Sequence, residues 1–218
     1  MSPGKELVRG RPIGDGLHVS VPTRQVRAVF TDETITVYQA YPVEIAGPAL
    51  QAGRFVPPFK RERMTWVKPS FLWMMYRCGW ATKPGQEQVL AVEITRDGFE
   101  WALGQSCLSQ DDPAHHQNRD HWSRLLRDSP VRVQWDPERS VHLQPLPHRS
   151  LQLGLSGPAV DRYVDEWLVT LTDVTALARQ VGTAVADGDL DSLTRLLPVE
   201  RPYPLPPHLA VRIDATDP

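Results

Sequence analysis

The stretch MTWVKPSFLWMMYRCGW, residues 64–80, has the start and end signals of a short helix. Pro69 and Ser70 are typical of a helix start, and Gly79 is typical of a helix end. We therefore expect one helix between them. The same stretch carries three tryptophans, a lysine, an arginine and a tyrosine, which is more aromatic and basic material than a core helix needs.

The predicted helix separates two kinds of side chain. Phe71, Met74 and Met75 share one face by their spacing, which indicates a core-facing side. Trp73 and Arg77 lie four positions apart on another face. They could stack as a purely structural cation–π pair. Alternatively, aromatic rings here enclose a planar ligand while a cation contacts its phosphate or carboxylate.

Upstream, residues 34–41 alternate as a β-strand does, after a first short strand that includes Arg27. Gln39 falls on the same side as the apolar positions of the strand, between Tyr38 and Tyr41. A buried amide needs hydrogen-bond partners, and a ligand could supply them. We therefore treat these residues as a second candidate group.

A third candidate group lies in residues 131–157, where we expect two strands and a turn at Asp-Pro-Glu-Arg. The group consists of Asp136, Glu138, Arg139, His148, Arg149 and Gln152. Carboxylate, imidazole and guanidinium groups in one cleft can stabilise a cationic sugar centre and hold phosphates.

The order of elements favours an α+β fold: a single domain with a small mixed or antiparallel sheet flanked by helices, and a helical C-terminal part. Pro48 should kink or split a helix predicted at 42–53. We expect a flexible tail over residues 1–22, a globular domain over 23–210 and a second tail over 211–218. Dinucleotide and Walker-type glycine motifs are absent from the sequence.

Composition excludes several classes of protein. With 41% hydrophobic and 23% charged residues in 218, the chain can bury a substantial core, and a net charge of -2 argues against bulk nucleic-acid binding. Two cysteines, Cys78 and Cys107, are too few for a disulfide framework, so we expect reduced thiols. No apolar run approaches bilayer length and no secretory signal is present, which predicts a cytoplasmic protein without a membrane partner.

Three histidines, His115, His116 and His121, lie close together in a polar segment. Without nearby cysteines this spacing favours a solvated surface over a metal site. We therefore predict no metal ligands.

Three segments carry a resemblance: residues 37–55, 66–84 and 129–157. They resemble the family catalogued as domain of unknown function 4291, over about Arg27 to Pro206. More distantly, Val37 to Tyr41 followed by Gly53-Arg54-Phe55 is similar to the ADP-ribosyltransferase superfamily, including its RNA 2′-phosphotransferase branch. Gln39 stands where that superfamily has a histidine, although an amide can also hydrogen-bond a ribose hydroxyl.

The distant resemblance implies an ADP-ribosyltransferase-like fold and an NAD-dependent enzyme that modifies a protein or nucleic-acid target. It implies that one group of residues contacts NAD: Arg27, Tyr38, Tyr41, Trp66, Lys68, Ser70, Trp73, Tyr76, Arg77, His148 and Arg149. Gln39 would act together with the residue at the superfamily's catalytic glutamate position. Three residues are candidates for that position: Asp136, Glu138 and Gln152. The alternative is a non-catalytic module that binds a nucleotide or nucleic acid through the same groups. In a third interpretation the protein is structural, and the Trp-rich stretch serves only as part of its hydrophobic core.

Overall fold

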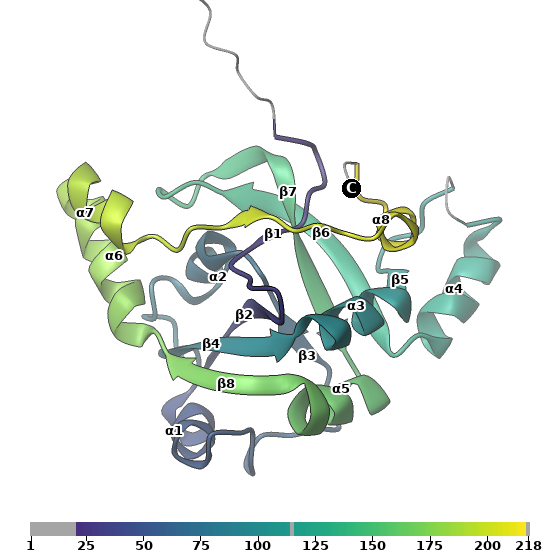
Figure 1. Ribbon diagram of the computed structural model, residues 1–218, viewed down its shortest axis with the longest axis horizontal. Helices are drawn as coiled ribbons and strands as arrows, with labels where there is room; N and C mark the ends of the chain where they lie inside the picture. Colours follow the sequence, from purple (N-terminus) through teal and green to yellow (C-terminus); the bar gives the residue numbers. More distant parts are fainter. Residues whose placement is uncertain (1–20, 114–115, 217–218) are drawn as a thin grey trace, which may run out of the picture.

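The computed structural model describes residues 21–113 and 116–216, and its two larger sheets carry most of the architecture (Figure 1). The first sheet is antiparallel and has the order β2–β4–β8, with β2 (Thr34–Tyr41), β4 (Gln88–Thr95) and β8 (Leu168–Asp173). The alternation that predicted β2 is present, since Ile35 and Val37 are fully buried.

The second sheet has four strands in the order β3–β7–β6–β5. Its members are β3 (Thr65–Val67), β7 (Pro145–Leu155), β6 (Val131–Arg139) and β5 (Ser106–Leu108). In this sheet β5 and β6 pair in parallel, and β7 pairs antiparallel with both β3 and β6. A small third sheet pairs β1 (Arg27–Ala28) with β9 (Arg201–Pro202).

Helices surround these sheets. They are α1 (Val43–Ala52), α2 (Phe71–Cys78), α3 (Arg96–Gly104), α4 (Arg119–Asp128), α5 (Pro158–Arg162) with the π-helical turn Tyr163–Trp167, α6 (Thr175–Asp187), α7 (Leu190–Leu196) and α8 (Pro207–Ile213). In Figure 1, α6 and α7 lie together at one end of the molecule, and α4 and α8 lie at the other. The α+β class is confirmed, and no helix of the described part is long and apolar enough to span a membrane.

The larger of two hydrophobic clusters joins both large sheets, and the smaller one packs α2, α6 and α7 against β2 and β4. Phe71, Met74 and Met75 belong to the smaller cluster, as their spacing predicted. The predicted ends of α2 are also correct. Ser70 Oγ accepts from Trp73 N, and Gly79 ends the helix in the left-handed conformation.

The two large sheets meet at Tyr38 and Lys68. Tyr38 N donates to Lys68 O at 2.7 Å, and Lys68 N donates to Tyr38 O at 3.3 Å. These bonds tie β2 to the segment directly after β3. Because these bonds hold the backbone of Lys68, they also fix the point between the two sheets from which its side chain extends.

Several expectations about the fold need correction. The sheet is three sheets within the described residues rather than one. Asp136 to Arg139 is not a turn, because these residues remain in β6. The strand has a bulge near Pro137, and proline is tolerated at a bulge although it has no N–H to donate to β7. Pro48 lies inside α1 without splitting it.

The expected tails fall partly outside the structure. Residues 1–20 and 217–218 lie outside the described residues. At the C-terminal end, α8 continues to Ile213, past the boundary expected at residue 210. Leu209, Ala210 and Ile213 are buried, so this segment packs against the domain.

Candidate functional site

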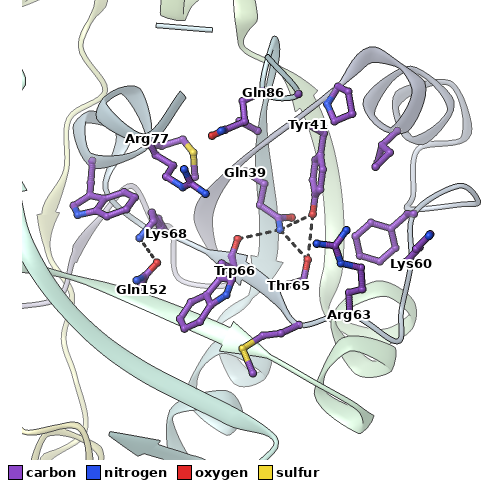
Figure 2. A pocket seen from close by; sticks show the side chains of 18 of the residues that line it. Gln39, Tyr41, Lys60, Arg63, Thr65, Trp66, Lys68, Arg77, Gln86 and Gln152 are labelled. Atoms are coloured by element: carbon purple, nitrogen blue, oxygen red, sulfur yellow. Dashed lines mark hydrogen bonds between the residues drawn. The ribbon is translucent and has the colours of Figure 1, made fainter. Parts of the chain in front are cut away.

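A cavity of about 710 Å³ opens between β2, β3, α2 and the β6–β7 pair (Figure 2). It gathers predicted residues from all three candidate groups: Gln39, Tyr41, Trp66, Lys68, Trp73, Arg77, Asp136 and Gln152. Residues that were not singled out in the sequence also line it, among them Lys60, Arg63, Thr65, Gln86 and Gln134. The volume is that of an ordinary small-molecule site.

Lys68 is the buried lysine of this cavity, with a side chain only 4% exposed. Its Nζ donates to Gln152 Oε1, lies 3.6 Å from Asp136 Oδ2 and sits 3.0 Å from the Trp73 ring centroid. Burial lowers the pKa of Lys68 to about 6, and Asp136 opposes this shift. Trp73 is therefore paired with Lys68 rather than with Arg77, which corrects the pairing considered from helical spacing.

Asp136 is held by the register of β6 and β7. Asp136 is opposite Ser150, and Gln134 is opposite Gln152, so the polar side chains of both strands share one face. Gln134 Nε2 donates to Asp136 Oδ1 at 2.8 Å. The other oxygen, Oδ2, is buried without a hydrogen-bond partner among the described residues.

Trp73 supplies a buried hydrogen-bond donor near the buried acceptor Asp136 Oδ2. Trp73 Nε1, on the same cavity wall, also has no hydrogen-bond partner within the part of the chain that the structure describes. Leaving such a group unpaired costs on the order of 1–3 kcal/mol. A polar ligand in the cavity would satisfy Trp73 Nε1 and Asp136 Oδ2.

Gln39 corrects one interpretation of the sequence. Its Oε1 accepts from Tyr163 OH at 2.7 Å, and its Nε2 faces Tyr41 OH at 2.8 Å, Trp66 O at 3.1 Å and Thr65 Oγ1 at 3.3 Å. Figure 2 shows the bonds from Gln39 to Tyr41, Thr65 and Trp66 at the cavity wall. The protein, not a ligand, supplies the partners of this amide.

Trp66 forms a half-buried aromatic wall of the cavity. It pairs with Gly154 across β3 and β7, and a Cβ at Gly154 would come within 2.9 Å of the Trp66 ring and of Met64 Sδ. Glycine therefore lets the ring lie directly over the neighbouring strand. The sequence contained this signal only as an isolated glycine in a strand pattern.

The mouth of the cavity carries exposed cations. Lys60, Arg63 and Arg77 are exposed and line the cavity, and none of their side chains makes a hydrogen bond or ion pair with a residue that the structure describes. Figure 2 shows Arg77 on the opposite side from Arg63 and Lys60. By contrast, Arg61 in the same loop pairs with Asp165. The mouth is therefore suited to an anionic ligand.

Four predicted residues lie near α2 without lining the cavity. Tyr38 packs its ring against Phe71, and Ser70 caps α2 while donating to Glu138 Oε1 at 2.9 Å. Glu138 Oε1 also accepts from Arg139 N. Tyr76 is exposed, and its ring faces the Arg139 guanidinium at 3.6 Å.

The remaining three predicted residues lie further away. Arg27 donates to Glu200 O, and the pKa of His148 is lowered by burial and by Arg27. Arg149 donates to Trp135 O and lines a separate cavity of about 110 Å³. Strand alternation explains this result, since Arg149 and Gln152 point to opposite faces of β7.

We expect Glu200 to make the stability of the protein depend on pH. Burial raises the pKa of its carboxyl to about 8, with a smaller contribution from Glu138, although Phe71 N donates to it at 2.6 Å. The folded state binds this proton more tightly than the unfolded chain does. Stability from this group is therefore complete below the ordinary glutamate pKa and is lost as pH rises through about 8.

We expect Glu200→Gln to flatten this decline. Chemical denaturation at about pH 5.5 and about pH 8.5 should show a smaller loss of unfolding free energy in the variant than in the wild type. The exposed Glu62 provides the control, since Glu62→Gln should leave the decline unchanged. Equal declines in all three proteins would contradict the assignment to Glu200.

Within residues 21–113 and 116–216, no cluster of three or more His, Cys, Asp or Glu side chains is arranged to hold a metal ion. Of the histidines considered from the sequence, His115 lies outside these residues, and His116 is buried rather than solvated.

Comparisons with known proteins identify the family of the chain. A search of curated proteins gives no match. The family model described as Domain of unknown function (DUF4291) matches residues 25–203, and the chain therefore belongs to this family.

Proposed function

We propose that the protein binds NAD in this cavity and transfers its ADP-ribose group to a protein or nucleic-acid acceptor. The observation that supports this most directly is the combination within one cavity of an aromatic wall, exposed cations and a buried carboxylate. Trp66 supplies the exposed ring surface, Arg63 and Arg77 face each other across the mouth, and Asp136 supplies the carboxylate. A cytoplasmic location is part of this proposal.

The reaction would break the N-glycosidic bond of NAD and release nicotinamide. Positive charge then develops at the ribose carbon until the acceptor nucleophile forms its bond and gives up a proton. A fixed carboxylate stabilises such a centre best when it is already in place and poorly hydrated. Asp136 has these properties, because its Oδ2 is buried and lacks a hydrogen bond from any described residue.

Among the three candidates for the catalytic acidic position, the geometry favours Asp136. Glu138 does not line the cavity, and its Oε1 already accepts from Ser70 and from Arg139 N. Gln152 lines the cavity but uses its Oε1 to accept from Lys68. We therefore assign charge stabilisation to Asp136 and ligand positioning to Gln152.

Arg63, Arg77 and Lys68 would have different roles because they differ in burial. Arg63 and Arg77 are exposed at the mouth, where a guanidinium can hold a pyrophosphate through paired hydrogen bonds. Lys68 is too deeply enclosed for that role, since its Nζ is surrounded by Trp73, Gln152 and Asp136.

A second candidate function is a non-catalytic module that binds a nucleotide or nucleic acid. The hydrogen bonds of Gln39 favour it, because both ends of this amide already have partners within the protein. Stacking on Trp66 and phosphate contacts at Arg63 and Arg77 would suffice for binding. It differs from the enzyme in needing nothing from Asp136.

Thermal unfolding with and without ligand tests both functions. A ligand that binds only the native state adds RT ln(1 + [L]/Kd), about 2.7 kcal/mol at a hundredfold excess over Kd. We expect NAD and ADP-ribose at millimolar concentration to raise the unfolding temperature, and NAD to release nicotinamide. A shift with a short single-stranded oligonucleotide alone would favour the binding module, and no shift with any ligand would contradict both.

A further inference from the structure

Lys68 differs from the other lysines that the structure describes. The sequence has four: Lys5, Lys60, Lys68 and Lys83. Lys5 lies outside the described residues, Lys60 is exposed, and Lys83 is exposed with its Nζ donating to Tyr76 O and Arg77 O. Lys68 alone of the three described lysines is enclosed in a cavity wall.

The surroundings of the Lys68 amine suit a nucleophile. Gln152 Oε1 accepts one of its hydrogen bonds, and the Trp73 ring covers one side. Asp136 Oδ2 lies 3.6 Å away, close enough to stabilise a cation formed at this nitrogen but too far for a strong hydrogen bond. The charged neighbours Arg77 and Glu138 act on it from α2 and β6 with opposite sign.

We propose that the Lys68 amine forms an imine with the aldehyde carbon of an anionic sugar bound in this cavity, the open-chain ribose end of ADP-ribose. This inference takes its ligand from the proposed function, but it does not require that the protein cleave NAD. The exposed cations Arg63 and Arg77 would hold the phosphates at the mouth, while the sugar end reaches Lys68 in the wall.

The chemistry balances without a redox partner. The nitrogen lone pair attacks the aldehyde carbon, the carbon–nitrogen bond forms, and the carbonyl electron pair moves to oxygen. A proton passes from nitrogen to oxygen and gives a carbinolamine. One proton from the solvent lets the hydroxyl group leave as water, and the protonated imine that forms is stabilised by the charge of Asp136. The sum is amine, aldehyde and one proton to protonated imine and water.

The cavity also keeps this amine reactive near neutral pH. Burial lowers the pKa of Lys68 to about 6, so most of the amine is unprotonated at pH 7.5. An ordinary lysine is only about 0.1% unprotonated at that pH. The lower intrinsic nucleophilicity of a less basic amine offsets part of this difference, and a net advantage of at least about tenfold remains.

The test is reductive trapping on the full-length protein. Protein, ADP-ribose and cyanoborohydride are incubated at about pH 7.5, and the modified lysine is located by peptide mass mapping. We expect Lys68 to be labelled at least about tenfold faster than Lys60 or Lys83 in the same sample. The variant Lys83→Arg should keep this fast labelling, because Lys83 does not line the cavity, and Lys68→Arg should lose it. Ribose 5-phosphate, run in parallel, shows whether the adenylate half is required.

The outcomes separate this inference from the proposed function. If ADP-ribose raises the unfolding temperature but Lys68 is labelled no faster than Lys60, the imine is excluded while the nucleotide cavity stands. If Lys68 is labelled rapidly but NAD releases no nicotinamide, the nucleophilic lysine stands and the transferase fails. The wild-type mapping compares lysines within one molecule, so it decides the question even if Lys68→Arg does not fold.

Discussion

Asp136→Asn is expected to slow nicotinamide release from NAD by about 10²–10³-fold, because it removes the charge that stabilises the ribose cation. The substitution preserves shape and keeps an oxygen for the hydrogen bond from Gln134. The variant should therefore still unfold cooperatively and still bind ADP-ribose. Release of labelled nicotinamide at saturating NAD measures the effect.

Glu138→Gln is the matched control, because Glu138 is a carboxylate of the same strand that does not line the cavity. It should leave nicotinamide release within a few-fold of the wild type. Two results would remove Asp136 from the proposed reaction. One is full activity of Asp136→Asn with unchanged dependence on NAD concentration, and the other is an equal loss in both variants.

Gln39→Leu is expected to lower the free energy of unfolding by about 2–4 kcal/mol, since it leaves several buried polar groups without a partner. The Tyr163 hydroxyl loses its acceptor, and Tyr41 and the Trp66 carbonyl lose their donor. Denaturant unfolding at neutral pH measures the loss. A substitution at an exposed glutamine such as Gln51→Leu should change stability far less.

Tyr163→Phe separates the parts of this network. It removes one hydroxyl from the fully buried ring, and we expect a loss of about 1–2 kcal/mol. In the double variant the two losses should not add, because the same hydrogen bond is absent in both single variants. If Gln39→Leu retains wild-type stability but loses ligand binding, the amide serves the ligand instead.

Local sequence signals predicted α2 and the main strands well. The ends of α2 depend on Ser70 and Gly79, and its core face on Phe71, Met74 and Met75, all within three turns of one helix. The α+β class followed from such local patterns. The Asp-Pro-Glu-Arg segment misled the prediction, because proline and acidic residues are common in turns, yet pairing with β7 keeps this segment in a strand.

The candidate site was predicted only in part. Gln39 was expected to be buried, and it is, but its partner Tyr163 comes from a distant helix and could not be found by periodicity. Arg149 and Gln152 were grouped together, although they point to opposite faces of β7 and only Gln152 lines the cavity. Lys60 and Arg63 were not singled out from the sequence, although both line the cavity.

Helix caps, apolar faces and strand alternation depend on short-range geometry, so they can be predicted from neighbouring residues alone. Which polar groups meet depends on the tertiary structure. Strand register turned Asp136 and Gln152 toward Lys68, and the pairing of β3 with β7 placed Trp66 over Gly154. The burial that lowers the pKa of Lys68 depends on Trp73, Gln152 and the surrounding sheets together. These contacts join distant parts of the chain, and no local pattern encodes the distance between them.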